Sequence, residues 1–206
     1  SYGEVGGKLL PGADSNASGV SAMLSLADMF AKMRDLGRLY GNSLIFVGLD
    51  AREMNSAGAE DLWKRIESLS MKDPVTGETI SPESIHSMVA LDILGSTLAP
   101  IHKNRDDYLM MLSDGHFTAD LVDANKKEDM GMDIAFNYYG SRNFTRMFHD
   151  RIGDQRIFVE NGIHCALFTS GITMETNKET DTAESLDYYI LKQRICLIFR
   201  WFEKML

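Results

Sequence analysis

The sequence predicts an α/β protein, a three-layer α/β/α sandwich around a mixed, largely parallel central sheet. Short continuous apolar runs bounded by turn residues recur along the 206 residues, and they are typical of strands buried on both faces. Amphipathic helical patterns alternate with these runs, as they do in sheets covered by helices. No internal repeat or linker divides the chain, so we expect a single domain over residues 1–206.

The N-terminal half supplies the first alternation. Residues 1–13 are glycine-rich and are expected to form a loop, and apolar residues at helical spacing predict a helix from Ser18 to Leu36. SLIFVGLD, Ser43–Asp50, predicts a buried strand, and a helix follows over Ala57–Leu69. The polar turn cluster Asp73–Ser84 predicts a surface excursion.

The C-terminal half repeats the pattern. Strands are predicted within His86–Ser96, Asp106–Leu112 and Gly162–Gly171, with a helix over His116–Lys127. An unusually apolar helix, Ala183–Met205, closes the chain. It is expected to pack on the sheet, and the alternative is that its apolar face forms a homo-oligomer or partner surface.

Composition limits the classes of function. The net charge of −9 argues against a nucleic-acid partner, and no apolar run is long enough to span a membrane. At 44% hydrophobic and 25% charged residues, a soluble globular protein is expected. The chain begins at Ser1 rather than Met, so an exported form with its signal segment removed stays open and the compartment is undetermined. Cys165 and Cys196 lie in apolar surroundings and are expected to be free thiols.

Polar residues follow the predicted strands, where ligands bind in open α/β sheets. These are residues 50–53, Asp92 and residues 169–182, and the turn Asp14–Asn16 at the start of the first helix should open onto the same rim. Taken alone, Ser15 and Asn16 are expected to cap that helix by accepting hydrogen bonds from its free N–H groups.

Five segments, in order, carry a family resemblance: PGADSNASGV, IFVGLDAREMNSAGA, MVALDILGS, GDQRIFVENGIHCALFTSG and TNKETDT. Together they resemble the zinc aminopeptidases of the bacterial leucyl-aminopeptidase type, which are related to glutaminyl cyclases and to the transferrin receptor ectodomain. The match covers most of the chain. It implies a zinc-exopeptidase fold, with the family's N-terminal portion expected to be lacking, and an ancestral site for two co-catalytic zinc ions.

Carried over position by position, the resemblance implies a degenerate site. The family's bridging aspartate falls at Ser15, its general-base glutamate at Arg52 and its terminal histidine ligand at Asn177. A neutral hydroxyl cannot bridge two divalent cations, a guanidinium cannot accept a proton, and an amide is a poor zinc ligand. We expect Arg52 to replace metal charge by pairing with Glu53 or Asp92.

The remaining positions are mixed. Glu53 and Asp92 match acidic zinc ligands, whereas the histidine of the family's Ser-Asp-His falls at Gln155. The family's first histidine ligand belongs upstream of this loop, and none of the ten residues before Pro11 is a histidine. A one-residue slip in register would bring Asp14 into the site, and a single-metal site would then combine Asp14, Glu53 and Asp92.

The resemblance therefore favours a non-catalytic homologue that binds a peptide, a small ligand or a protein partner in the former substrate cleft, with no metal cofactor. The alternative is an active aminopeptidase or cyclase-like enzyme with one weakly bound zinc ion at a shifted site. A third interpretation is a piece of a larger enzyme in which upstream residues supply a ligand.

Overall fold

The central sheet has four strands, in the order β3–β6–β4–β5, in a computed structural model that describes residues 3–206. β3 pairs with β6 in parallel, β4 with β5 in parallel, and β4 with β6 antiparallel. The predicted α/β class with a mixed, largely parallel sheet is therefore confirmed. The strands are β3 (Ser87–Leu91), β4 (Tyr108–Ser113), β5 (Asp133–Ala135) and β6 (His164–Thr169).

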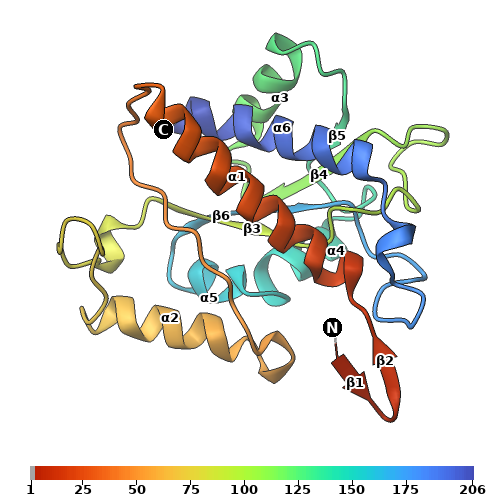
Figure 1. Cartoon of the computed structure of the whole chain (residues 1–206), viewed down its shortest axis with the longest axis horizontal. Coiled ribbons are helices and arrows are strands. Elements are labelled where there is room, and N and C mark those ends of the chain that lie inside the picture. Colours follow the sequence, from red (N-terminus) through yellow and green to blue (C-terminus); the bar gives the residue numbers. More distant parts are fainter. Residues whose placement is uncertain (1–2) are drawn as a thin grey trace.

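Helices cover both faces of the sheet, which gives the predicted three layers (Figure 1). α1 (Ser18–Asp35), α3 (Thr118–Lys127) and α6 (Tyr188–Met205) enclose the larger core cluster on one face. α2 (Ala57–Glu67) and α5 (Gln155–Glu160) enclose a second cluster on the other face. The shorter helical segments are η1 (Ala13–Ala17), η2 (Arg52–Met54), η3 (Pro82–Ser84), α4 (Arg142–Arg146), η4 (Met147–Arg151) and η5 (Ala183–Ser185).

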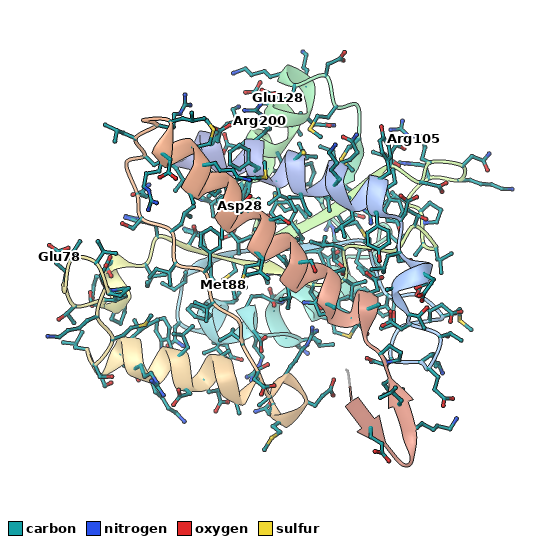
Figure 2. The ribbon with its side chains drawn as sticks, viewed as in Figure 1. Asp28, Glu78, Met88, Arg105, Glu128 and Arg200 are labelled. Atoms are coloured by element: carbon teal, nitrogen blue, oxygen red, sulfur yellow. The ribbon has the colours of Figure 1, made fainter. Side chains whose placement is uncertain are left out.

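The closing helix is a core element. Leu197, Ile198 and Trp201 of α6 are fully buried, so this face of the helix packs inside the protein as expected. The helix begins at Tyr188, later than predicted, because the short turn η5 precedes it. Figure 2 shows Arg200 of α6 beside Glu128, and their side chains form an ion pair of 3.1 Å at the surface. Between residues 3 and 206 no helix has the length and apolar character needed to cross a bilayer.

Two sequence-based expectations are wrong. SLIFVGLD, Ser43–Asp50, is irregular and largely exposed instead of a buried strand. A strand requires a neighbour for its backbone hydrogen bonds, and this run has none in the described chain. Residues 1–13 were expected to be a loop, but β1 (Gly3–Val5) and β2 (Lys8–Leu10) form an antiparallel hairpin. Gly6 and Gly7 have positive φ values of 58° and 77°, which a two-residue hairpin turn of this kind requires.

Candidate functional site at the carboxyl edge of the sheet

The loop before α1 is fixed by a buried carboxylate from a distant segment. Asp181 accepts hydrogen bonds from the backbone N–H groups of Asp14 (2.7 Å) and Ser15 (3.2 Å). The Ser15 hydroxyl donates to the same carboxylate at 2.9 Å, and Asn177 Oδ1 lies 3.3 Å from that hydroxyl. The Ser15 side chain therefore binds the segment after β6. The expectation that it caps the helix is wrong. The role of Asp181 was not predicted, although its position in the TNKETDT segment was the available signal.

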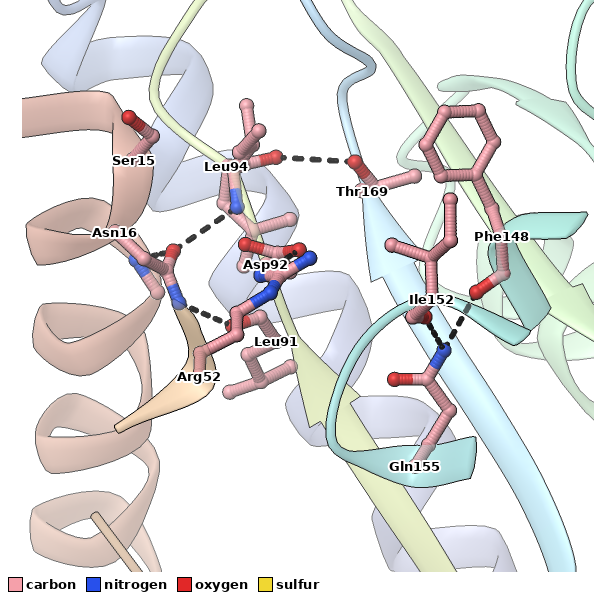
Figure 3. Close-up of polar contacts among 12 residues, drawn as sticks. Ser15, Asn16, Arg52, Leu91, Asp92, Leu94, Phe148, Ile152, Gln155 and Thr169 are labelled. Carbon is pink, nitrogen blue, oxygen red and sulfur yellow. Dashed lines mark hydrogen bonds and ion pairs between the residues drawn. The ribbon is translucent and has the colours of Figure 1, made fainter. Parts of the chain in front are cut away.

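Asn16 joins the loop to the end of β3, as Figure 3 shows. Its side chain donates to the Leu91 carbonyl at 2.8 Å and accepts from the Ile93 N–H at 2.9 Å. It also accepts from the Gly19 N–H at 3.1 Å, so its predicted contact with the first turn of α1 is present. A Cβ atom at Gly19 would lie 2.4 Å from the Leu91 carbonyl oxygen, and only glycine permits this close packing.

Arg52 forms an ion pair with Asp92 at the carboxyl end of β3. Arg52 Nη1 lies 2.5 Å from Asp92 Oδ2, and the Asp92 side chain is only 16% exposed (Figure 3). Burial opposes the charge on Arg52, but Asp92, then Asp154 and Glu53, raise the pKa of the guanidinium above its ordinary value. The half-buried cation therefore lies among carboxylates, in the position that the family resemblance gives to a general base.

Asp154 is a member of this group that the sequence did not single out. Burial raises its pKa, and a hydrogen bond from Ser56 and the charge of Arg52 offset only part of this effect. Its match to the aspartate of the family's Ser-Asp-His was the signal that could have found it. Glu53, the other acidic neighbour, is exposed on the short helix η2.

Gln155 is not part of the rim that holds Arg52. Its buried amide nitrogen donates to the carbonyl oxygens of Phe148 (2.6 Å), Ile152 (2.8 Å) and His149 (3.2 Å). Figure 3 shows this amide directed toward the backbone of Phe148 and Ile152, away from Asp92. The side chain thus closes the turn that precedes α5. Of the sequence-predicted residues, Arg52, Glu53 and Asp92 lie together, and Ser15 contacts Asn177 separately.

Asp14 lies behind the loop, in the protein interior. Its Oδ1 accepts from the Gly95 N–H at 2.7 Å and from the Ser18 hydroxyl at 3.0 Å. Burial raises its pKa, opposed by these hydrogen bonds and by the nearby charge of Arg194. Arg194 of α6 is fully buried and donates to three backbone carbonyls, those of Leu94 (2.6 Å), Ser96 (2.8 Å) and Tyr108 (2.7 Å).

The raised pKa of Asp14 gives a pH-dependent stability with a definite sign. Between the unfolded value near 3.8 and the higher folded value, the native state binds more protons than the unfolded state. The contribution of Asp14 to stability is therefore present at low pH and is lost as the pH rises through this window. Asp14→Asn should remove this loss. Urea unfolding from pH 4 to pH 7 should show wild type losing stability relative to Asp14→Asn, and parallel curves would contradict the assignment.

The donor groups present do not fit a dinuclear zinc site. Within residues 3–206 there is no group of three or more His, Cys, Asp or Glu side chains placed to share a metal ion, so Asp14, Glu53 and Asp92 do not form one. The Ser15 hydroxyl is bound to Asp181, and Arg52 places a cation against Asp92. A second cation beside that guanidinium would be repelled.

Solved structures with the same fold include bacterial aminopeptidases. A zinc aminopeptidase from Bacillus subtilis superposes with a TM-score of 0.67 at 17% identity, over 95% of this chain and 42% of that one. An aminopeptidase from Aneurinibacillus sp. strain AM-1 gives 0.63 at 20% identity, over 95% and 40%. Nicastrin, a γ-secretase component, gives 0.63 at 14% identity, over 94% and 36%. The chain thus spans less than half the length of these proteins, and at these identities the likeness shows the fold.

Family membership rests on the sequence. No curated protein sequence matches the chain significantly. The profile of peptidase family M28, in contrast, matches residues 2–194, which include the loop before α1, the Arg52–Asp92 pair and the segment that carries Asp181. The chain therefore belongs to peptidase family M28.

Proposed function

We propose that this chain is a non-catalytic member of family M28 that binds a peptide or protein segment at the rim formed by Arg52, Asp92 and the residues after β6. The ion pair between Arg52 and Asp92 is the observation that carries the proposal. It neutralises, with a side chain, a carboxylate that the family resemblance assigns to a metal ion. The Arg52 side chain is still 40% exposed, so a ligand can reach it.

The surroundings of the rim suit a polypeptide ligand. Ile172 and Met174, on the segment after β6, are exposed apolar side chains, and Met adapts readily to different partners. Arg52 provides a cation that can bind a carboxylate or a backbone carbonyl.

Metal content and hydrolysis test the proposal. Purified protein that is incubated with zinc and then dialysed should retain well below one zinc ion per chain, and it should not hydrolyse an aminoacyl anilide. Near-stoichiometric zinc together with hydrolysis would overturn the proposal and favour the active enzyme with a shifted metal site.

A rebuilt site tests the assignment of positions. Combining Ser15→Asp, Arg52→Glu and Asn177→His restores a bridging carboxylate, an acid and an imidazole, so the triple variant should gain zinc. Arg105→Glu is the matched control, because Arg105 is also partly exposed and paired with a nearby aspartate, Asp107. Zinc measured by mass spectrometry should rise in the triple variant only. An equal rise in the control would indicate non-specific binding and contradict the mapping.

A further inference from the structure

Two buried polar atoms, one on Asp14 and one on Arg194, have no hydrogen-bond partner among residues 3–206. Asp14 is 5% exposed and Arg194 is fully buried. The atoms are Asp14 Oδ2, which can accept a hydrogen bond, and Arg194 Nη2, which carries two hydrogens to donate. A buried polar group without a partner costs free energy, and native proteins contain few of them. The two atoms therefore point to a small group that binds both.

The other polar atoms of the two side chains meet at one turn, residues 94–96 after β3. Asp14 Oδ1 accepts from the Gly95 N–H at 2.7 Å. Arg194 Nη1 donates to the carbonyl oxygens of Leu94 at 2.6 Å and Ser96 at 2.8 Å. Within the described chain, Asp14 Oδ2 and Arg194 Nη2 do not bond to each other. The carboxyl and guanidinium groups are thus held at the same turn, with one atom of each left over.

The charges of the two groups restrict what can bind between them. A metal cation would be repelled by Arg194, and an anion would be repelled by Asp14. A water molecule, in contrast, can donate to a carboxylate oxygen and accept from a guanidinium at the same time. Water also fits a protonated Asp14, because its oxygen can accept from both groups. This second state is relevant because burial raises the pKa of the Asp14 carboxyl.

We propose that a buried water molecule binds Asp14 Oδ2 and Arg194 Nη2 and so joins the loop before α1 to the closing helix α6. Buried waters typically make about three hydrogen bonds to groups that would otherwise lack a partner. The water would connect the two side chains that fix the turn after β3 from different parts of the chain. The link does not depend on which ligand the rim binds.

A surface pocket beside α1 and α6, which pack together in Figure 1, brings solvent close to this site. The pocket has a volume of about 610 Å³, and Ser18, Leu191 and Ile195 contribute to its lining. The Ser18 hydroxyl donates to Asp14 Oδ1 at 3.0 Å, and Leu191 and Ile195 lie on either side of Arg194 in the sequence of α6. Water in the pocket is therefore separated from the Asp14 carboxyl by little more than the Ser18 side chain.

A high-resolution crystal structure of the wild-type chain tests the site directly. We expect density for a water oxygen within about 3.2 Å of both Asp14 Oδ2 and Arg194 Nη2. Direct contact between these two atoms, or a protein group placed between them, would overturn the proposal. So would a map in which neither atom has a water beside it.

Water–protein nuclear Overhauser spectra test the site in solution with a matched pair of variants. Asp14→Asn keeps a polar atom at the Oδ2 position, whereas Asp14→Leu places a methyl group there. The Arg194 side-chain N–H protons should show dipolar contact with long-lived water in the wild type and in Asp14→Asn, and should lose it in Asp14→Leu.

Arg200 is the internal control for these spectra, because its side chain is 44% exposed and should show only exchange with bulk water. A contact that persists in Asp14→Leu would place the water elsewhere and contradict the proposal. If Asp14→Leu does not fold, the wild-type spectrum and the crystal structure still decide, since a wild-type Arg194 without long-lived water would rule out the link.

Discussion

Replacing Arg194 with methionine is expected to lower the free energy of unfolding by about 3–5 kcal/mol. Arg194 is fully buried, and its guanidinium donates to the carbonyls of Leu94, Ser96 and Tyr108. Methionine fills similar volume but removes the guanidinium donors from three carbonyl oxygens, of which Ser96 keeps only the Tyr108 hydroxyl at 3.4 Å. It also removes the positive charge near the buried Asp14. The turn after β3, which positions both Asp14 and Asp92, would lose its anchor to α6.

Arg200→Met, on the same helix, is the matched control. Arg200 is partly exposed and pairs with Glu128 and Glu203, so its loss should cost about 1 kcal/mol or less. Urea unfolding followed by circular dichroism measures both variants. If Arg194→Met were as stable as Arg200→Met, the three carbonyl contacts would not contribute as the geometry indicates.

Replacing Asp181 with alanine is expected to lower the free energy of unfolding by about 3 kcal/mol or more, since hydrogen bonds to charged groups contribute about 1.5–3 kcal/mol each. The carboxylate accepts from the backbone of Asp14 and Ser15 and from the Ser15 hydroxyl. Its removal leaves donors in the buried loop without an acceptor. Hydrogen exchange at Asp14 and Ser15 should accelerate together with the loss of stability.

Glu179→Ala provides the comparison within the same segment. Glu179 pairs with Lys8 at the surface, so its removal should change stability by about 1 kcal/mol or less and leave exchange in the loop unaltered. Asp181→Asn, which keeps one acceptor oxygen, should fall between the two. Protected loop amides in Asp181→Ala would show that Asp181 does not fix the loop.

The sequence alone predicted much of the site because hydrophobic periodicity and family motifs are both local patterns. Apolar runs and helical spacing located α1, α2 and three strands, and the polar residues after the parallel strands β3 and β6 do meet at one edge of the sheet. The resemblance placed Ser15, Arg52 and Asp92 in motif order, and the expected pairing of Arg52 with Asp92 is present. The direction in which a side chain points could not be predicted from these patterns. Gln155 is in the matching motif, but its amide is bound by the backbone of the preceding turn.

The buried charges could not be located from the sequence. Arg194 lies in an apolar helical run, and Asp181 lies 166 positions from Ser15 along the chain, so nothing local indicates what either side chain contacts. Asp154 acquires its raised pKa because folding buries its carboxyl group and brings it near Asp92, which outweighs the opposing effects of Ser56 and Arg52. Each case depends on long-range desolvation and charge pairing, which residue spacing does not encode.

The sequence by itself determined the α/β class, the family and the order of the segments that form the rim, since periodicity and motifs are written along the chain. Only the tertiary structure decided that SLIFVGLD is exposed. Its composition is that of a buried strand, but whether such a run becomes one depends on a neighbour that supplies backbone hydrogen bonds. Within the described chain that neighbour is missing, so the same apolar residues that predict a strand form an unpaired surface instead.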